Sequence, residues 1–493
     1  MDDILPRLLA FPPHPSPALP LSDQQFDEGI RALVEVVKGI SDSKLLQKTA
    51  SGEHLLDFVN PSLNTASYTF ILVANLNKAK QYEKAVDMDA LWNNICTFLS
   101  GFDPRQIRYL GHELAQIIDT FANIAQRHHR IPLALPRIRD ALIRYDPTGT
   151  VFTPKHLLLV KLAVEARSYD DVVPVLEKTI LYIPGASEQP NPEFICNMTL
   201  SPLASITAHS SFVPKHTKSQ DILEYFLLSG MAYIGLNNWR RAKECLERAI
   251  TYPAKENGCS KIMTEAYKKW VLVSLLLDGK SPTLPMVTSG GTAKLYHTLA
   301  KPYEIVSQIF EAGTASRLKS EIETGQTIWQ QDMNVGLMMA VLAAYQQFQI
   351  RNLGKVHSKL SIMDIHNATQ SAEVGGKLGQ AQFVRTLVQN MIANGSLDAS
   401  LSYPPDKSPV VTFSENGPAM SEKMTQVALA ESTHRIKALA LQINNIDRTM
   451  TYEKEYLKHV QKVRKNKKNT DQGVVSVDMD WPGEDEDLMA SMY

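Results

Sequence analysis

Histidine and aspartate side chains occur in two short stretches whose composition could bind a metal ion. In RHHR, His128 and His129 are adjacent, so in a helix they would point about 100° apart. Two ligands on one helix need a spacing of three or four residues. In HSKLSIMDIH, Asp364 and His366 are two residues apart and would also face different ways. We therefore assign both stretches structural or surface roles and predict no metal site and no cofactor.

Phosphate binding and nucleophilic catalysis also lack the necessary patterns. The glycine-rich stretch GGKLGQ, residues 375–380, does not have the GxxxxGK[ST] spacing of a P-loop, and a helical pattern rather than a strand precedes it. We interpret it as a loop before a helix. Ser210 in TAHSSF is not part of a GxSxG nucleophile turn. The sequence therefore predicts no catalytic residues and a protein that is not an enzyme.

The overall composition excludes further classes of protein. The chain has 493 residues, a formal net charge of −1, 44% apolar residues and 21% charged residues. This is a globular balance without a net field to attract nucleic acid or a membrane. Four scattered cysteines without a CxxC pair suit a reducing compartment. The acidic N-terminus does not resemble a signal peptide, and no apolar run approaches the roughly 20 residues of a membrane span. We expect an intracellular protein.

Apolar residues at helical spacing dominate the chain after a proline-rich start. Residues 1–22 are predicted to be a disordered lead-in. In YFLLSGMAYIGLNNWRRAKECLERAITYP, small residues at Gly230 and Ala242 and large ones at Tyr233 and Leu246 match the tetratricopeptide spacing. Such a helix pair cannot bury its apolar face alone and must stack on neighbours. We therefore predict a helical-repeat arm over residues 23–330, with an ordinary helical hairpin as the alternative.

A second stretch, residues 153–184, has the same plan of helix, turn, helix and closing proline. Setting Tyr169 on Trp239 aligns the two stretches at an offset of 70 residues, which is twice a repeat of about 35. We predict a second helix pair here, with Leu176 and Ile180 on its second helix.

The pattern changes in residues 331–415. Three helical stretches are followed by two runs of alternating apolar and polar residues around the turn PPDKS, which is the order of a winged helix. Ser361 is the predicted N-cap of the second helix. On the third helix we expect Phe383, Val384, Leu387 and Met391 to share one face.

The C-terminal part contains one long helical pattern and an acidic end. Residues 416–468 keep an apolar 3-4 spacing for more than three heptads, broken at Glu453. They end in KVRKNKK, which is either a solvated helix end or a nuclear-import signal. Residues 469–493 are acidic and predicted to be disordered. Trp481 leaves a docking peptide as the alternative to a solvating end.

The order of helical repeats, winged helix and terminal helix resembles the PCI-domain family. The stretches that carry the resemblance are DILEYFLLSGMAYIGLNNWRRAKECLERAITYPA, SKIMTEAYKKWVLVSLLLDGK, LSIMDIHNATQ and VRTLVQNMIANGSLDASL. They imply a PCI domain over about residues 220–415. The N-terminal third and the loop SPTLPMVTSGGTAK depart from the pattern. The family includes scaffold subunits of the proteasome lid, the COP-nine signalosome and a translation initiation factor, and the likeness is strongest to the signalosome.

The resemblance implies a fold and a function. The fold is mostly α, with tetratricopeptide-like repeats, a winged-helix subdomain and a long C-terminal helix. The function is that of a non-catalytic scaffold in the signalosome, which removes the ubiquitin-like modifier Nedd from cullins. Its partners would be other PCI-domain subunits and the metalloprotease subunit pair, in the cytoplasm and the nucleus. The metalloprotease needs an HxH motif, and none occurs in this chain. A PCI subunit of the lid or of the initiation factor is the alternative.

The same resemblance implies that wing strands join into a common sheet and that terminal helices form a bundle. An apolar stripe on the terminal helix would otherwise leave side chains in water, unless the helix packs on its own chain. The predicted partner-interface residues are Leu397, Leu401, Val411, Phe413, Ile436, Leu439, Ile443, Ile446, Met450 and Leu457.

A winged helix can also bind DNA, which is the alternative outside the family. A reading helix needs basic residues for phosphates and base edges. The third predicted helix carries Arg385 as its one basic residue, beside uncharged Gln380, Gln382 and Gln389. We therefore predict no nucleic-acid partner.

Overall fold

The computed structural model describes residues 4–13, 21–48, 53–81, 87–184, 193–198, 206, 212–213, 217–253, 258–404, 408–414, 422–452 and 458. Within these residues the elements are nearly all helices, and a small three-stranded sheet has the order β1-β3-β2. The prediction of a mostly α fold is confirmed. None of the helices in this part of the chain is both long enough and apolar enough to cross a membrane.

The helices before residue 217 are short or medium in length. They are α1 (Leu5–Leu8), α2 (Asp23–Lys38), α3 (Asp42–Leu45), α4 (Leu55–Phe58), α5 (Thr65–Gln81), α6 (Met88–Gly101), α7 (Pro104–Ile107), α8 (Gly111–Arg127), α9 (Ile131–Tyr145), α10 (Pro154–Ala166) and α11 (Val173–Leu176).

The later elements include the sheet and the longest helix. They are α13 (Ser219–Gly235), α14 (Trp239–Ile250), α15 (Lys261–Asp278), α16 (Gly290–Leu299), α17 (Lys301–Ala312), α18 (Ala315–Thr324), α19 (Gln326–Gln331), α20 (Val335–Gly354), β1 (Lys359–Ser361), α21 (Ile362–Ala368), α22 (Ala381–Ala393), β2 (Ala399–Ser402), β3 (Val410–Phe413) and α23 (Glu422–Tyr452).

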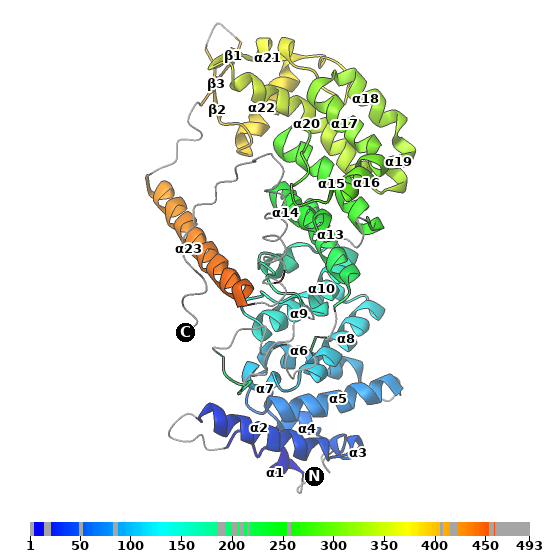
Figure 1. Cartoon of the computed structure of the whole chain (residues 1–493), viewed down its shortest axis with the longest axis vertical. Coiled ribbons are helices and arrows are strands. Elements are labelled where there is room, and N and C mark those ends of the chain that lie inside the picture. Colours follow the sequence, from blue (N-terminus) through cyan, green and yellow to red (C-terminus); the bar gives the residue numbers. More distant parts are fainter. Residues whose placement is uncertain are drawn as a thin grey trace, which may run out of the picture. The chain divides into compact units, whose positions relative to one another are not determined.

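The chain divides into two compact units. The first comprises residues 1–397 and 401–411, and the second comprises residues 398–400 and 412–493. Within the first unit, helices that follow one another along the chain pack together, as α13, α14 and α15 do (Figure 1). The second unit contains helix α23, which is continuous over 31 residues.

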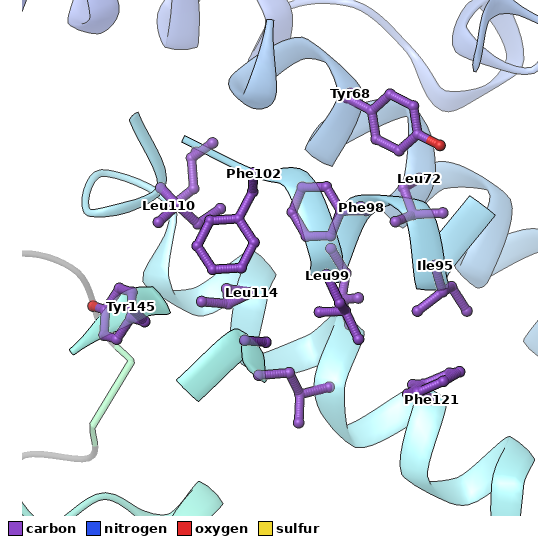
Figure 2. Close-up of a cluster of buried hydrophobic side chains, with 14 of the residues drawn as sticks. Tyr68, Leu72, Ile95, Phe98, Leu99, Phe102, Leu110, Leu114, Phe121 and Tyr145 are labelled. Carbon is purple, nitrogen blue, oxygen red and sulfur yellow. The ribbon is translucent and has the colours of Figure 1, made fainter. Parts of the chain in front are cut away.

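An aromatic-rich core holds helices α5, α6 and α8 together (Figure 2). The rings of Tyr68 in α5 and Phe98 in α6 are stacked with their centroids 5.8 Å apart. Trp92 in α6 lies 4.5 Å from Phe121 in α8, again between ring centroids. Aromatic pairs of this kind stabilise a fold by about 0.5–1.5 kcal/mol beyond the burial of their area. The N-terminal helices therefore share one well-packed interior.

The N-terminal lead-in is partly ordered, which corrects the prediction of disorder there. Residues 4–13 include α1 and bury Leu8 and Phe11 in the N-terminal core. The carbonyl oxygens of these two residues accept hydrogen bonds from Ser67 Oγ at 2.6 Å and Asn64 Nδ2 at 3.0 Å. The apolar side chains between the prolines therefore anchor the segment, which the proline content alone did not reveal.

The pair α13 and α14 packs as the sequence predicted. A Cβ atom on Gly230 would lie 2.8 Å from the side chain of Leu246 on the facing helix. Ala242 and Leu246 are fully buried. Glycine is therefore required at 230 because the large leucine occupies the space of its missing side chain.

The second predicted pair is only half formed, which corrects the sequence interpretation. Helix α10 forms, but α11 ends at Leu176, so the predicted helix does not reach Ile180. Instead the backbone becomes extended, and Tyr182 donates its N–H to the Thr150 carbonyl at 3.0 Å and accepts the N–H of Phe152 at 2.9 Å. Residues 179–183 are TILYI, whose β-branched and aromatic side chains favour this conformation.

Helix α10 and its turn connect the two halves of the first unit. Leu159 of α10 belongs to the N-terminal core, whereas Val160 belongs to the core formed by α13 to α20. Tyr169 in the following turn lies against Gly235, where a Cβ atom would be 2.4 Å from its ring. The two helix pairs that were aligned through Tyr169 and Trp239 are therefore neighbours in the structure and contact each other.

A buried polar cluster fixes helix α15 to the segment that leads into α20. Lys268 pairs with Asp332 at 2.7 Å, and Lys269 pairs with Glu265. Lys269 also donates to the side-chain oxygen of Asn334 at 2.8 Å. Tyr303 of α17 donates to Asp332 at 2.7 Å and accepts from Asn334 at 2.9 Å. Because each buried group has a partner, the cluster determines the orientation of α20 without an unpaired charge.

Helix α20 begins the winged helix, whose elements follow in the order α20, β1, α21, α22, β2, β3. Ser361 caps α21 as predicted, because its hydroxyl accepts the N–H of Asp364 at 3.1 Å. Strand β1 lies directly before this cap and was not predicted. Phe383 on α22 is 59% exposed, whereas Val384 and Met391 are buried. The prediction that Phe383 shares their face is therefore wrong: Val384, Val388 and Met391 form the buried stripe at 4-3 spacing.

The first prediction concerns the contact between α13 and α14. The substitution Gly230→Val should lower the free energy of unfolding by about 1–3 kcal/mol, because the buried side chain of Leu246 has no room to move away. The control is Gly336→Ala in α20, where no atom lies within 4 Å of an added Cβ. It should stabilise by about 0.5–1 kcal/mol through helix propensity. Urea unfolding checks both, and equal effects would contradict the packing account.

A second prediction concerns His156, which is buried in α10. Burial lowers its pKa from 6.5 to about 4. Between pH 6.5 and about 4, His156 is protonated in the unfolded chain but stays neutral in the folded chain. The free energy of unfolding must therefore fall as the pH falls below 6.5. From pH 8 to pH 5 the loss should be about 2 kcal/mol. His156→Gln should lack this component in urea unfolding at the two pH values. The same pH dependence in both proteins would contradict the account.

Candidate protein-interaction surfaces

The wing strands place their apolar side chains inside the fold. Leu397, Val411 and Phe413 are 7%, 0% and 6% exposed, and Leu401 is half-buried. The alternation predicted for both strands is present, but its apolar face covers the chain's own interior. Leu397, Val411 and Phe413 are therefore covered by the chain's own fold, and Leu401 is covered in part. A sheet that is solvated on one face turns its apolar residues toward its own domain.

The wing also has backbone edges. Strand β3 lies between β1 and β2, so β1 and β2 are both edge strands. Within the wing, the Ser414 N–H donates to the Asp398 carbonyl at 2.9 Å, and Ser402 Oγ donates to the Val410 carbonyl at 3.2 Å. The outer side of an edge strand presents N–H and C=O groups that can pair with another strand.

Helix α23 carries the exposed part of the predicted interface. Ile436, Leu439 and Ile443 are 66%, 47% and 56% exposed, and Ile446 is half-buried. Met450 belongs to the helix, but its side chain lies outside the described residues, as does Leu457. At 100° per residue these positions fall within one stripe about 100° wide.

The opposite side of α23 provides a comparison. Val427 and Leu441 are 52% and 65% exposed, and each lies about 140–180° around the helix from Ile436. These two residues lie far apart along the helix, and single exposed apolar residues are common on protein surfaces. The stripe differs because its members recur at 3-4 spacing and can enter the groove of another helix together.

The residues singled out for chemistry have structural roles. His128 ends helix α8, and His129 follows it with a left-handed φ of 53°. Asp364 caps α21 with Ser361, and His366 Nε2 lies 2.7 Å from the Leu378 carbonyl. In the part of the chain that the structure describes, no group of three potential ligands is placed to bind a metal.

The GGKLGQ stretch is a loop before α22, as predicted. Gly375 has a φ of 81°, and the N–H of Ser371 donates to the Gly376 carbonyl at 2.8 Å. This turn reverses the chain between α21 and α22. The element before it is a helix and not a strand. The geometry is that of a connection rather than a phosphate-binding loop.

The third helix of the winged domain is poorly suited to DNA. The guanidinium carbon of Arg385 lies 4.9 Å from the ring centroid of Tyr403. The positive charge of Arg385 therefore interacts with an aromatic ring of the chain's own wing. Tyr403 is also held by Gln389, whose Nε2 donates to its hydroxyl at 2.8 Å. No other basic residue is present on α22. Phe383, which we expected on the buried face, is exposed on this helix, because counting from Val384 at 4-3 spacing leaves it outside the buried stripe.

Comparison with known proteins identifies the family. A family model described as COP9 signalosome complex subunit 3, N-terminal helical repeats, matches residues 27–290. The match includes most of the N-terminal third, which corrects the expectation that this part departs from the family pattern.

Two curated relatives span nearly the whole chain. The Neurospora crassa protein named COP9 signalosome complex subunit 3 is 34% identical over 94% of this chain and 92% of its own length. The Emericella nidulans protein of the same name is 32% identical over 99% of both chains. Both relatives therefore match along nearly the full chain, from the helical repeats to helix α23. The chain belongs to the family of COP9 signalosome complex subunit 3.

Proposed function

We propose that this chain is a non-catalytic scaffold subunit of a signalosome that deneddylates cullin ubiquitin ligases. The name of its relatives supports membership of that complex. The observation that carries the scaffold role is the apolar stripe of α23, with Ile436, Leu439 and Ile443 exposed in the chain by itself. A neighbouring subunit is the partner that would cover it.

The stripe supports association with other helices on energetic grounds. Burying one leucine or isoleucine side chain stabilises by about 1.5–3 kcal/mol. Several such side chains on one helix together outweigh the entropy lost when a helix is fixed against its partners. Apolar residues at 3-4 spacing pack in the nearly parallel arrangement of helix bundles. We therefore place α23 in a bundle with the terminal helices of other PCI-domain subunits.

We further propose that the wing contributes through its backbone. Because Val411 and Phe413 face inward, wing side chains add little to a contact with a neighbour. The edge of β2 can instead pair with a strand of another winged helix, which extends the sheet by hydrogen bonds. The helical repeats then hold this edge in position through α20.

We assign the chemistry of deneddylation to the metalloprotease subunit pair and no cofactor to this chain. The support is that His366, Asp364 and Ser361 are engaged in helix capping or loop contacts. We expect the complex in the cytoplasm and the nucleus. A PCI subunit of the proteasome lid or of an initiation factor is the second candidate, and the identity of the co-purifying metalloprotease distinguishes the two complexes.

The third prediction tests the stripe with matched substitutions. Ile436→Asp with Ile443→Asp should reduce co-purification of other subunits at least tenfold, because a buried unpaired charge is costly in a helix interface. Val427→Asp with Leu441→Asp, on the opposite side of α23, should leave co-purification within twofold. Both variants should unfold thermally like the parent chain. Equal loss of assembly, or no loss in either, would contradict the bundle.

A fourth prediction concerns catalysis. The purified chain should leave a Nedd-modified cullin intact, whereas the complex isolated from the host through the tagged chain should cleave it. Gel electrophoresis of the cullin after incubation provides the measurement, and a metal chelator should stop the reaction of the complex because a zinc enzyme is expected to perform it. Cleavage by the isolated chain would contradict the scaffold role.

A further inference from the structure

A groove lies on the N-terminal helices, between the turn that follows α4 and helix α6. Its larger part has a volume of about 720 Å³, and an adjoining hollow measures about 140 Å³. Leu56 and Asn94 line both, so the two parts are adjacent. We call the whole the N-terminal groove. It is built into the helical core beneath it, because Tyr68 lines the groove and also stacks on Phe98 in that core (Figure 2).

Basic side chains line both parts of the N-terminal groove. Lys48, His54 and Lys78 line the small hollow, and Arg137 lines the large part. Among the described residues, no ion pair joins Lys48, Lys78 or Arg137 to a carboxylate; Arg137 donates to Ser100 Oγ at 3.1 Å. Burial and the charges of the two lysines lower the pKa of His54. The two ammonium groups therefore act on the same small space.

The carboxylates of the groove are already used by the backbone. Asp57 accepts the N–H of His54 at 2.8 Å, and Asp87 accepts the N–H of Asp89 at 3.0 Å. Both stabilise the first turn of a helix, α4 and α6 respectively, where negative charge is favoured. Asp57 and Asp87 keep their negative charge at the rim, whereas the two lysines and the arginine are cations that no carboxylate among the described residues neutralises.

The groove also has an apolar wall. Phe58 is 44% exposed and lines the large part together with Val59 and Pro61. A half-exposed aromatic ring beside unpaired cations fits a ligand that carries both carboxylates and an apolar side chain. Such aromatic positions often contribute most of the binding energy at a protein interface.

We infer that the N-terminal groove binds an acidic segment of a partner protein, with carboxylates against Lys48, Lys78 and Arg137 and an apolar side chain against Phe58. A protein segment fits better than a polyphosphate or a nucleic acid. Asp57 and Asp87 on the same rim would repel a dense cluster of phosphate charges, whereas carboxylates spaced along a peptide can avoid them. The site lies in the first unit and does not depend on the role proposed for α23.

The test places a photo-crosslinker in the groove of the complex as isolated from the host. Phe58→p-benzoylphenylalanine keeps an aromatic ring at an exposed position. Irradiation followed by mass spectrometry should identify an adduct with a segment of another subunit or partner that is rich in aspartate and glutamate. Lys48→Glu with Lys78→Glu should lower the adduct yield at least fivefold. The control, Lys294→Glu with Lys301→Glu on exposed positions of α16 and α17, should leave the yield unchanged.

Assembly of the complex is measured in the same samples by co-purification, which separates this inference from the proposed function. Intact assembly without any adduct would overturn the groove as a docking site. An adduct with a segment lacking carboxylates, with nucleic acid, or with the chain's own terminal residues would overturn the acidic partner. An adduct whose yield is unaffected by Lys48→Glu with Lys78→Glu would do the same.

Discussion

The described helices of the first unit bury their apolar faces by packing against neighbouring helices along the chain. The contact between Gly230 and Leu246 shows the constraint within a pair, because the leucine fills the volume that a side chain at 230 would need. Tyr169 against Gly235 shows it between neighbouring pairs. At both of these contacts a small residue meets a large one, which fixes the register of the helices.

Polar contacts then fix the direction in which the helical stack continues. The cluster of Lys268, Lys269, Asp332 and Asn334 connects α15 to the start of α20. From α20, the Gln346 side chain reaches Thr369 at 3.1 Å, and Arg351 donates to the Ser396 carbonyl at 2.6 Å. These directional bonds hold the later elements of the winged helix on α20, where apolar packing alone would allow several orientations.

The predictions that succeeded rested on local rules. The capping of α21 by Ser361 depends on four consecutive residues, and the packing of α13 on α14 depends on a spacing within one hairpin. The predictions that failed needed distant partners. The order of residues 4–13 depends on Ser67 and Asn64, and the early end of α11 depends on backbone pairing with Thr150. A single sequence does not indicate these contacts because the partners are far away along the chain.

The sequence by itself determined the mostly α fold, the order of repeats, winged helix and terminal helix, and the apolar stripe on α23. Each follows from the period at which apolar residues recur, which is written in the chain. Only the tertiary structure decided which apolar residues are available to partners. Val411 and Ile436 are both apolar residues in a periodic pattern, yet Val411 is fully buried and Ile436 is 66% exposed. It also decided where the N-terminal groove lies, because Lys48, Asn94 and Arg137 come together only when the segment between α3 and α4 packs with α6 and α9 on one core.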